Sequence, residues 1–317
     1  METRLSTDSP LLVPTLSPLP TSPWLNRLQS IARLGKKWPG ADRLRHIYHR
    51  ILAVASPTEQ MLFQPHPPRS APPSSAALTV MTANLWHDWP RQRQLRSRLE
   101  AFAALVEREQ VDVLLLQEVS RTPKLRVDEW LAQRLGMAYA YARANGHEPT
   151  LGFEEGLAVL SRYPLTAPRL RQLQPEPLPF VRRLALGATV RTHWGEMPVF
   201  STHLALERRQ NSAQLDDLRG WIGDDPALVG GDFNAHETAR QIKRASSQWL
   251  DLFRCVHPHA DATTHDGLWG RRRRRLDYLF WQPGCAAWQI LEARHLHPPD
   301  APHSDHHAVL ARLRCGA

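Results

Sequence analysis

The sequence predicts a layered α/β domain over residues 77–315. From Leu78 onward, short apolar runs typical of buried strands alternate with segments whose apolar residues recur at helical spacing. No internal repeat of fixed period is present. This alternation favours sheets covered by helices around a common core.

The expected elements follow one another in a regular order. Leu95, Leu99, Phe102 and Val106 mark an amphipathic helix, and further helical segments cover 130–135 and 206–222, the former ending at Gly136. The expected strands cover residues 78–83, 111–116, 157–160, 184–190, 198–202, 227–229, 276–280 and 307–313. The segments 184–190 and 198–202 are expected to pair with each other.

Residues 1–76 differ from the rest and are expected to form a separate N-terminal extension. Residues 65–75 form a Pro/Ser-rich linker, which predicts a domain boundary at residue 76. Two basic segments with helical spacing, near 24–36 and 42–54, precede it. They could contact a membrane surface or a partner, but packing against the main domain, or partial disorder, is the favoured interpretation.

Composition limits the function classes. The formal charge of +9 and the pI near 10.1 favour anionic partners such as nucleic acid, phospholipid surfaces or phosphorylated metabolites. No apolar run reaches the roughly 18 residues that a membrane-spanning helix needs, so no integral membrane segment is expected. The 3 cysteines are too few and too scattered for a disulfide framework or a zinc site, which indicates a reducing, cytoplasmic environment.

Polar side chains stand at the ends of the expected strands. Each alone is weak evidence, because single Asp and Asn residues often serve turns and a single His is often structural. The joint pattern, rich in carboxylates, amides and imidazoles, predicts a functional site built from loops on a rigid scaffold. Its members are Asn84, Glu118, His203, Asp232, Asn234, Asp277, Ser304, Asp305 and His306.

This inventory suits phosphoester hydrolysis, which is very slow without a catalyst. Mg²⁺ or Mn²⁺ held by oxygen ligands neutralises the phosphate, and Glu118 and Asp305 are the predicted ligands. Asn84 and Asn234 can hydrogen-bond phosphoryl oxygens without adding negative charge. Zinc is disfavoured, because the cysteines lie apart from this set.

Water must also be oriented or deprotonated for attack. Either His306 or Asp232 can serve as that base, and the residues leave this choice open. A carboxylate beside a histidine fixes its tautomer and stabilises the imidazolium, a role that suits Asp277 with His306.

Taken in order, seven short segments resemble the endonuclease/exonuclease/phosphatase superfamily, which includes deoxyribonuclease I, AP endonucleases and neutral sphingomyelinases. The segments read TANLW, LLQEV, GLAVLSRYP, STHL, GGDFNA, RRLDYLF and SDHHAV, and the resemblance runs from Leu78 to Arg314. It implies a four-layer α/β/β/α sandwich with two packed mixed β-sheets and a metal site at one edge. The forms of the motifs look most like the deoxyribonuclease, sphingomyelinase and generic bacterial branches.

By position, the resemblance also assigns roles. Asn84 matches the family's first Asn, Glu118 its metal-binding Glu, and His203 its phosphate-contacting His. The Asp-x-Asn pair is matched by Asp232 and Asn234, the Asp that orients the final His by Asp277, and the closing Asp-His by Asp305 and His306.

A run of arginines adjoins Asp277. Arg271, Arg272 and Arg273 could grip a phosphodiester backbone, or the run could be a solvated loop in which one arginine pairs with a core carboxylate. Together these features predict a Mg²⁺- or Mn²⁺-dependent phosphodiesterase, with nucleic acid slightly favoured over lipid head groups. A phosphatase of inositides or metabolites is the second alternative, and a non-catalytic nucleic-acid binder is the least favoured.

Overall fold

The structure is a computed structural model that describes residues 10–14, 54, 60–67, 77–175, 181–267, 273–284 and 288–315. Apart from Val54, the expected helical segments 24–36 and 42–54 lie outside the described residues, as does most of the linker at 65–75. No helix in the described part of the chain is long and apolar enough to cross a membrane.

The described strands form two sheets. The first has the strand order β1-β2-β6-β7-β4-β3-β15-β14, with β5 paired to β4. Its strands are Leu11–Pro14 (β1), Gln60–Gln64 (β2), Leu78–Asn84 (β3), Val113–Thr122 (β4), Leu125–Arg126 (β5), Ala138–His147 (β6), Phe153–Ser161 (β7), Trp288–Leu296 (β14) and Ala308–Cys315 (β15). Both parallel and antiparallel pairs occur, so this sheet is mixed.

The second sheet has the order β12-β13-β11-β10-β9-β8 and is also mixed. Its strands are Leu165–Gln172 (β8), Leu184–Thr192 (β9), Gly195–His203 (β10), Ala227–Asp232 (β11), Leu250–Asp251 (β12) and Asp277–Gln282 (β13). The expected pairing of 184–190 with 198–202 is confirmed as the antiparallel hairpin β9–β10.

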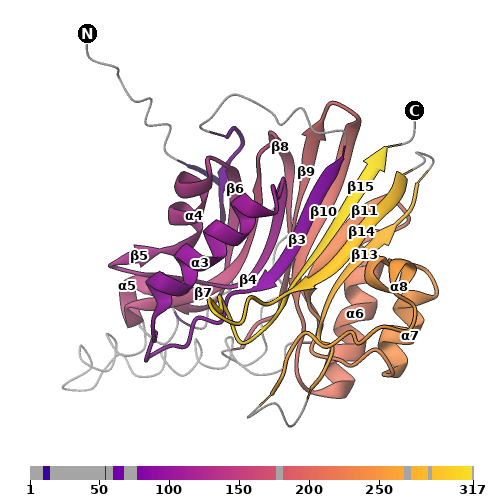
Figure 1. Ribbon diagram of the computed structural model, residues 1–317. Coiled ribbons are helices and arrows are strands. Elements are labelled where there is room, and N and C mark those ends of the chain that lie inside the picture. Colours follow the sequence, from indigo (N-terminus) through magenta and orange to yellow (C-terminus); the bar gives the residue numbers. More distant parts are fainter. Residues whose placement is uncertain are drawn as a thin grey trace, which may run out of the picture.

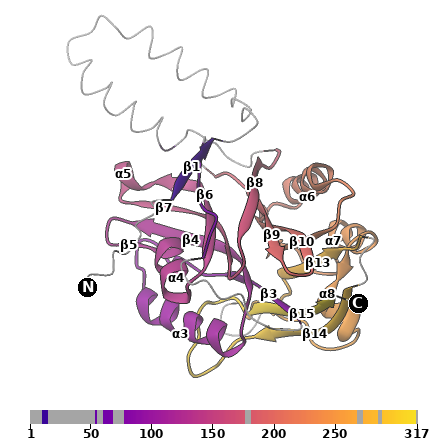
Figure 2. The same ribbon diagram turned by 90° about the horizontal axis from the view of Figure 1, so that it is seen from above.

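Helices cover the outer faces of the two sheets (Figures 1 and 2). The described helices are Leu95–Arg108 (α3), Val127–Leu135 (α4), Glu148–Leu151 (α5), Arg208–Ile222 (α6), Arg240–Ser246 (α7) and Leu252–Val256 (α8). Apolar residues of α3 and α4 pack on the first sheet, and those of α6 and α7 pack on the second. The predicted four-layer α/β/β/α sandwich is therefore confirmed.

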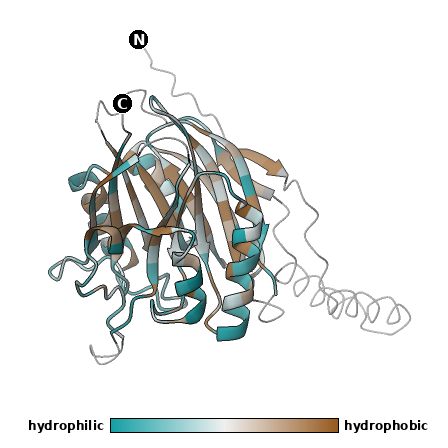
Figure 3. Ribbon diagram, turned by 90° about the vertical axis from the view of Figure 1, so that its right-hand side faces the viewer, coloured by the Kyte–Doolittle hydropathy of each residue, from teal (hydrophilic) through white to brown (hydrophobic). Residues whose placement is uncertain are grey.

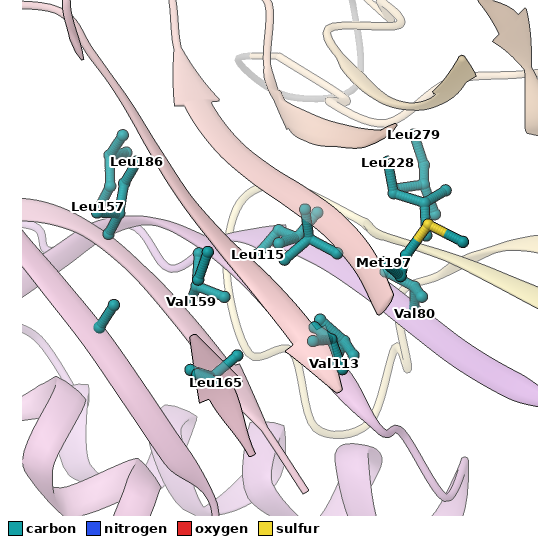
Figure 4. Packing of buried hydrophobic residues seen from close by; sticks show 14 of the residues in the cluster. Val80, Val113, Leu115, Leu157, Val159, Leu165, Leu186, Met197, Leu228 and Leu279 are labelled. Carbon is teal, nitrogen blue, oxygen red and sulfur yellow. The ribbon is translucent and has the colours of Figure 1, made fainter. Parts of the chain in front are cut away.

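Successive side chains of a strand point to opposite faces of the sheet, so the apolar strands supply three buried layers. One lies between the sheets and one lies between each sheet and its helices. In β4, Val113 and Leu115 face the second sheet, whereas Leu114 and Leu116 face the helices. Figure 4 shows Leu157 of the first sheet beside Leu186 of the second. The strands are mostly brown and the helices carry teal residues in Figure 3, as expected for amphipathic helices outside a buried sheet pair.

Parallel pairing at the centre of both sheets places several strand ends at one edge. Strand β3 runs parallel to β4, and β10 runs parallel to β11. The chain reads Gly230-Gly231 just before the end of β11, and a Cβ on Gly230 would lie 2.8 Å from Leu115 of the other sheet. Gly230 therefore lets the two sheets approach closely beneath the edge where the polar residues gather.

Part of the predicted N-terminal extension belongs to the first sheet. Strand β2 pairs with β6, and the side chains of Met61 and Phe63 are buried in the core between the sheets. Arg182, itself buried, donates to the carbonyl oxygen of Val54 over 3.1 Å. The boundary at residue 76 stays a prediction, but residues 60–64 extend the sheet on which the domain is built.

This pairing predicts the effect of truncation. A chain that begins at residue 74 lacks β2, so the edge of β6 and the pockets for Met61 and Phe63 are exposed to water. We expect its free energy of unfolding to be lower by about 3–6 kcal/mol than that of the full chain, because each large apolar side chain contributes about 1.5–3 kcal/mol. A chain that begins at residue 59 keeps β2 and is the matched control in urea titrations. Equal stability of the two truncated chains would show that β2 contributes nothing.

Candidate active site

The candidate site begins where the rows of side chains between the sheets change from apolar to polar. In β10, Val199 is a core residue and is followed on the same face by Ser201 and His203. The same change ends the inward rows of the neighbouring strands. It produces Thr82 and Asn84 in β3, Gln117 in β4, Asp232 in β11 and Asp277 in β13. The site is thus the polar end of the apolar core.

Gln117 ties the two sheets together beneath the site. Its Nε2 donates to Ser201 Oγ over 2.9 Å and to Thr82 Oγ1 over 3.2 Å, and all three residues are fully buried. Sequence reasoning did not single out Gln117. The residue acts through long-range contacts, which a pattern along the chain does not reveal.

Asn84 joins two of the predicted carboxylates. Its Nδ2 donates to Glu118 Oε1 and to Asp232 Oδ2, each over 3.1 Å. Glu118 has a φ of 53° at a shift in the β4–β7 register, and this bulge turns its side chain toward the site edge. The backbone N of His87 donates to Glu118 Oε2 over 3.3 Å. Asn84 therefore orients both carboxylates, which uses both protons of its amide, and its hydrogen bond to phosphate stays a prediction.

Asp277 and His306 form a buried pair, as the sequence predicted. His306 Nδ1 lies 2.8 Å from Asp277 Oδ2, and the same oxygen accepts the hydroxyl of Thr264 over 2.7 Å. Thr264 Oγ1 in turn accepts the backbone N of Asp277 over 3.0 Å. Thr264, Asp277 and His306 come from three separate segments, and their contacts fix the orientation of the imidazole. Nδ1 of His306 is engaged by Asp277, which leaves Nε2 as the ring nitrogen available to the site.

Charge decides the protonation of this pair. Burial alone would lower the pKa of His306, but the carboxylate of Asp277, with further help from Asp232 and Asp305, raises it to about 10. Burial, and then the charge of Asp277, raise the pKa of Asp232 to about 7. His306 is therefore an imidazolium at neutral pH, while Asp232 titrates near neutrality.

His203 and Asn234 complete the arrangement around Asp232. Nε2 of His203 lies 3.5 Å from Asp232 Oδ2, and burial together with the positive charge of Arg183 lowers the pKa of His203 well below its usual value. Asn234 donates its backbone N to Asp232 Oδ1 over 2.9 Å and its side-chain Nδ2 to the carbonyl of Leu204 over 3.0 Å. His203 is thus a neutral group beside the carboxylate, and Asn234 holds the loop after β11.

Glu118 and Asp305, the predicted metal ligands, are electrostatically coupled. Burial raises the pKa of Asp305, and the nearby negative charge of Glu118 raises it further. His265 also adjoins this group, with its Nε2 3.9 Å from Asp305 Oδ2 and its ring 4.6 Å from that of His306. Two mutually repelling carboxylates beside an amide form a set of oxygen donors that fits a hard cation such as Mg²⁺ or Mn²⁺.

Arg98 of α3 is a positioning residue that the sequence pattern did not reveal. Its guanidinium donates to the carbonyl oxygens of Leu85 and His303 over 3.0 and 3.2 Å, and to that of Trp86 over 2.9 Å. It also lies over the Trp86 ring at 4.7 Å. Arg98 thereby fixes the loop after Asn84 and the loop before Asp305 relative to each other.

A ledge of aromatic side chains extends outward from Glu118. His87 Nε2 lies 3.6 Å from Glu118 Oε2, and the His87 ring contacts the edge of Phe153 at 5.1 Å. Trp89 stacks on Phe153 with ring centroids 4.9 Å apart and remains 47% exposed. We call His87, Trp89 and Phe153 the aromatic ledge. A large exposed indole beside a charged site is a surface suited to stacking.

The predicted arginines are only partly placed. Arg271 and Arg272 lie outside the described residues. Arg273 pairs with Asp261 over 2.6 Å and with Asp266 over 3.5 Å, so its described partners are loop carboxylates. Arg275, in contrast, is fully buried against Asp251 over 2.6 Å. One arginine of the run therefore pairs with a core carboxylate, which is the alternative that the sequence left open.

Comparison with known proteins identifies the family of this chain. The model of the Endonuclease/Exonuclease/phosphatase family matches residues 81–306, well over half of the chain. The curated proteins compared contain no match. A structure of an endonuclease/exonuclease/phosphatase from Beutenbergia cavernae is similar, with 25% identity, a TM-score of 0.64 and coverage of 76% of this chain and 72% of that one.

Two further structures share the fold at lower identity. The human nocturnin catalytic domain with a bound sulfate anion has 21% identity, a TM-score of 0.62 and coverage of 81% of this chain and 96% of that one. D. rerio TDP2 complexed with a single-strand DNA product has 14% identity, a TM-score of 0.61 and coverage of 76% and 100%. Because the family model matches residues 81–306, this chain belongs to the endonuclease/exonuclease/phosphatase family, whose members are hydrolases of phosphoester bonds.

Proposed function

We propose that this protein is a Mg²⁺- or Mn²⁺-dependent phosphodiesterase that acts on nucleic acid. The observation that carries the proposal is the joint placement, at one sheet edge, of a buried His306–Asp277 pair, a base-competent Asp232 and the Glu118–Asp305 carboxylates. Non-catalytic binding of nucleic acid needs no such arrangement.

Glu118 and Asp305 would hold the cation, with Asn84 fixing Glu118. When bound, the cation polarises a phosphoryl oxygen and offsets the negative charge of the phosphate. Neutral His203 stands beside Asp232 and can donate a hydrogen bond to a phosphoryl oxygen without adding repulsion, whereas both amide protons of Asn84 already go to Glu118 and Asp232.

The pKa shifts of His306 and Asp232 favour one of these two residues as the base, a choice that the sequence left open. The imidazolium of His306, held by Asp277, is already protonated at neutral pH and cannot accept a proton from water. It is suited instead to stabilise a developing negative charge on phosphate. Asp232, with a pKa raised to about 7, can accept the proton of the attacking water. We therefore assign Asp232 as the general base and His306 as the cationic donor.

The preference for nucleic acid has two supports besides the net charge of +9. The aromatic ledge stands beside Glu118, where it can stack a base that flanks the reacting phosphate. D. rerio TDP2, which shares the fold, was solved with a single-strand DNA product. Lipid head groups and inositides remain the alternative substrates.

The direct test is hydrolysis by the purified full chain. Bis(p-nitrophenyl) phosphate should be hydrolysed with Mg²⁺ or Mn²⁺ and not with EDTA, and single-stranded DNA or RNA should be cleaved in preference to sphingomyelin or phosphoinositide vesicles. Activity that survives EDTA would overturn the metal dependence. Activity on the vesicles alone would move the assignment to the lipid alternative.

The aromatic ledge predicts a substrate-specific effect. Replacing Trp89 by Ala should raise KM for a single-stranded oligonucleotide by about 5- to 150-fold, because stacking of one base is worth about 1–3 kcal/mol. Turnover of bis(p-nitrophenyl) phosphate should change little, because that diester engages mainly the cation site. Leu250→Ala, at a 40% exposed apolar residue of β12, is the control. An equal loss of activity on both substrates would show that Trp89 supports the active site and does not stack on a nucleobase of the substrate.

A further inference from the structure

Beside the active site lies a group of one Asp and two His side chains that takes no part in the proposed reaction. Asp266, His297 and His307 come from three separate segments, yet each brings one donor atom to within 4.8 Å of the other two. His307 directly follows His306 in the chain. In an extended segment successive side chains point to opposite sides, so the two histidines can serve two different sites.

The separation of two of the donors fits a small tetrahedral ion. His307 Nε2 lies 3.2 Å from Asp266 Oδ2. Two ligands bound to zinc at about 2.0–2.1 Å in tetrahedral geometry lie about 3.3–3.4 Å apart, which is close to this separation. The rings of His297 and His307 stack with centroids 4.4 Å apart and an interplanar angle of 12°. The two imidazoles are therefore adjacent, and one ring has to turn for the nitrogen lone pairs of both to face a common ion.

Buried ring nitrogens without partners give an independent indication. Within the described structure, His297 Nδ1 is buried and has no hydrogen-bond partner. His303 is only 2% exposed, both of its ring nitrogens lack partners, and its ring lies 6.1 Å from that of His297. Buried polar atoms in native proteins are normally satisfied, and an unsatisfied group points to a missing water or ion.

The donor types select the ion. Two imidazoles and one carboxylate are the ligands that zinc takes, whereas Mg²⁺ prefers oxygen donors such as those of Glu118 and Asp305. We propose that Asp266, His297 and His307 bind a structural Zn²⁺ ion next to the active site. Asp266 is 42% exposed at its side chain, which leaves room for water as a fourth ligand and for entry of the ion.

Such an ion would hold the active-site pair in place. The backbone N of His307 donates to Thr264 O over 2.7 Å, and Thr264 also donates its hydroxyl to Asp277. Fixing Asp266 to His307 therefore fixes the segment that carries Thr264 against the one that carries His306. Arg273 Nε also lies 3.5 Å from Asp266 Oδ1. This ion pair is exposed, so it would hold the loop of Asp266 more weakly than a bound metal ion.

Titration of the metal-free full chain with Co²⁺ tests the proposal without any activity assay. Co²⁺ replaces zinc, and a four-coordinate site gives a strong visible absorption that an octahedral oxygen site does not. We expect one such site per chain, from which Zn²⁺ displaces the Co²⁺. The Glu118→Gln variant should keep it, as should His193→Gln, a control in the hairpin between β9 and β10. Because the readout is binding, failure of this proposal is distinct from failure of the proposed function.

Two variants should remove the site. His297→Gln and Asp266→Asn should weaken Co²⁺ and Zn²⁺ binding by at least about 100-fold, since loss of a mere supporting group already costs about 10- to 100-fold. Asp266→Asn is the gentler change, because its half-exposed amide can still pair with His307. Absence of the absorption in the wild type, its persistence in both variants, or its loss in Glu118→Gln would overturn the proposal.

Discussion

Glu118→Gln is expected to lower kcat/KM for any phosphodiester substrate by about 1,000-fold, comparable with removing a principal electrostatic contact of a transition state. The glutamine oxygen can still accept the amide of Asn84, which now lies 3.1 Å from Glu118 Oε1, so the fold should survive. What is lost is the negative charge that, under the proposed function, would hold the cation. The concentration of Mg²⁺ required for half-maximal activity should therefore rise as well, and a metal titration of both enzymes measures it.

The matched control is Glu100→Gln. Glu100 lies on α3, is 49% exposed and pairs with Arg134 over 3.6 Å. It is the same chemical change away from the site and should leave kcat/KM and the Mg²⁺ titration unchanged. Full activity of Glu118→Gln at limiting Mg²⁺ would refute the assignment of Glu118 as the metal ligand.

The strand-end positions show how far the sequence could predict this site. Asn84, Glu118 and Asp277 were found because each ends or opens an apolar run, and the end of a buried strand is readable along the chain. The pairing of His306 with Asp277 was also predicted, and His306 Nδ1 lies 2.8 Å from Asp277 Oδ2. Assignment of chemical roles to these residues stays a prediction until it is measured.

Residues that support the site were not predictable in this way. Thr264 lies in a loop, and its role depends on contact with Asp277, which is 13 residues away. Arg98 looks like any cation on an amphipathic helix, although it binds a carbonyl 205 residues away. Such contacts are fixed by tertiary packing and leave no local signal.

Seven of the 15 described strands, among them β2, β6, β8 and β14, are not predicted by the sequence pattern. Strand β6 begins AYAY, and alanine gives no clear strand signal although Ala138, Ala140 and Ala142 are buried. Strands β8 and β14 carry few fully buried side chains because each lies at the edge of its sheet, so their apolar pattern is weak. Strand β2 was missed because its neighbouring proline-rich residues favoured a linker.

The His306–Asp277 pair should respond to mutation as one unit. His306→Ala and Asp277→Asn should each lower kcat by about 100- to 10,000-fold. The double variant should be no worse than the more damaged single variant, because an imidazole that lacks its carboxylate has already lost its function. Losses that multiply would show that the two side chains act independently.

The pH profile separates positioning from general damage to the fold. In the wild type, activity should rise as Asp232 loses its proton near pH 7 and fall as His306 loses its proton near pH 10. The carboxylate of Asp277 raises both of these pKa values, so its removal should lower both. In Asp277→Asn, the acidic and alkaline limbs of the kcat profile should therefore shift together toward lower pH, whereas a variant that merely loosened the fold would lose activity at every pH with its limbs unmoved. Unshifted limbs in Asp277→Asn would contradict the assignment of Asp232 as base and His306 as the cationic donor.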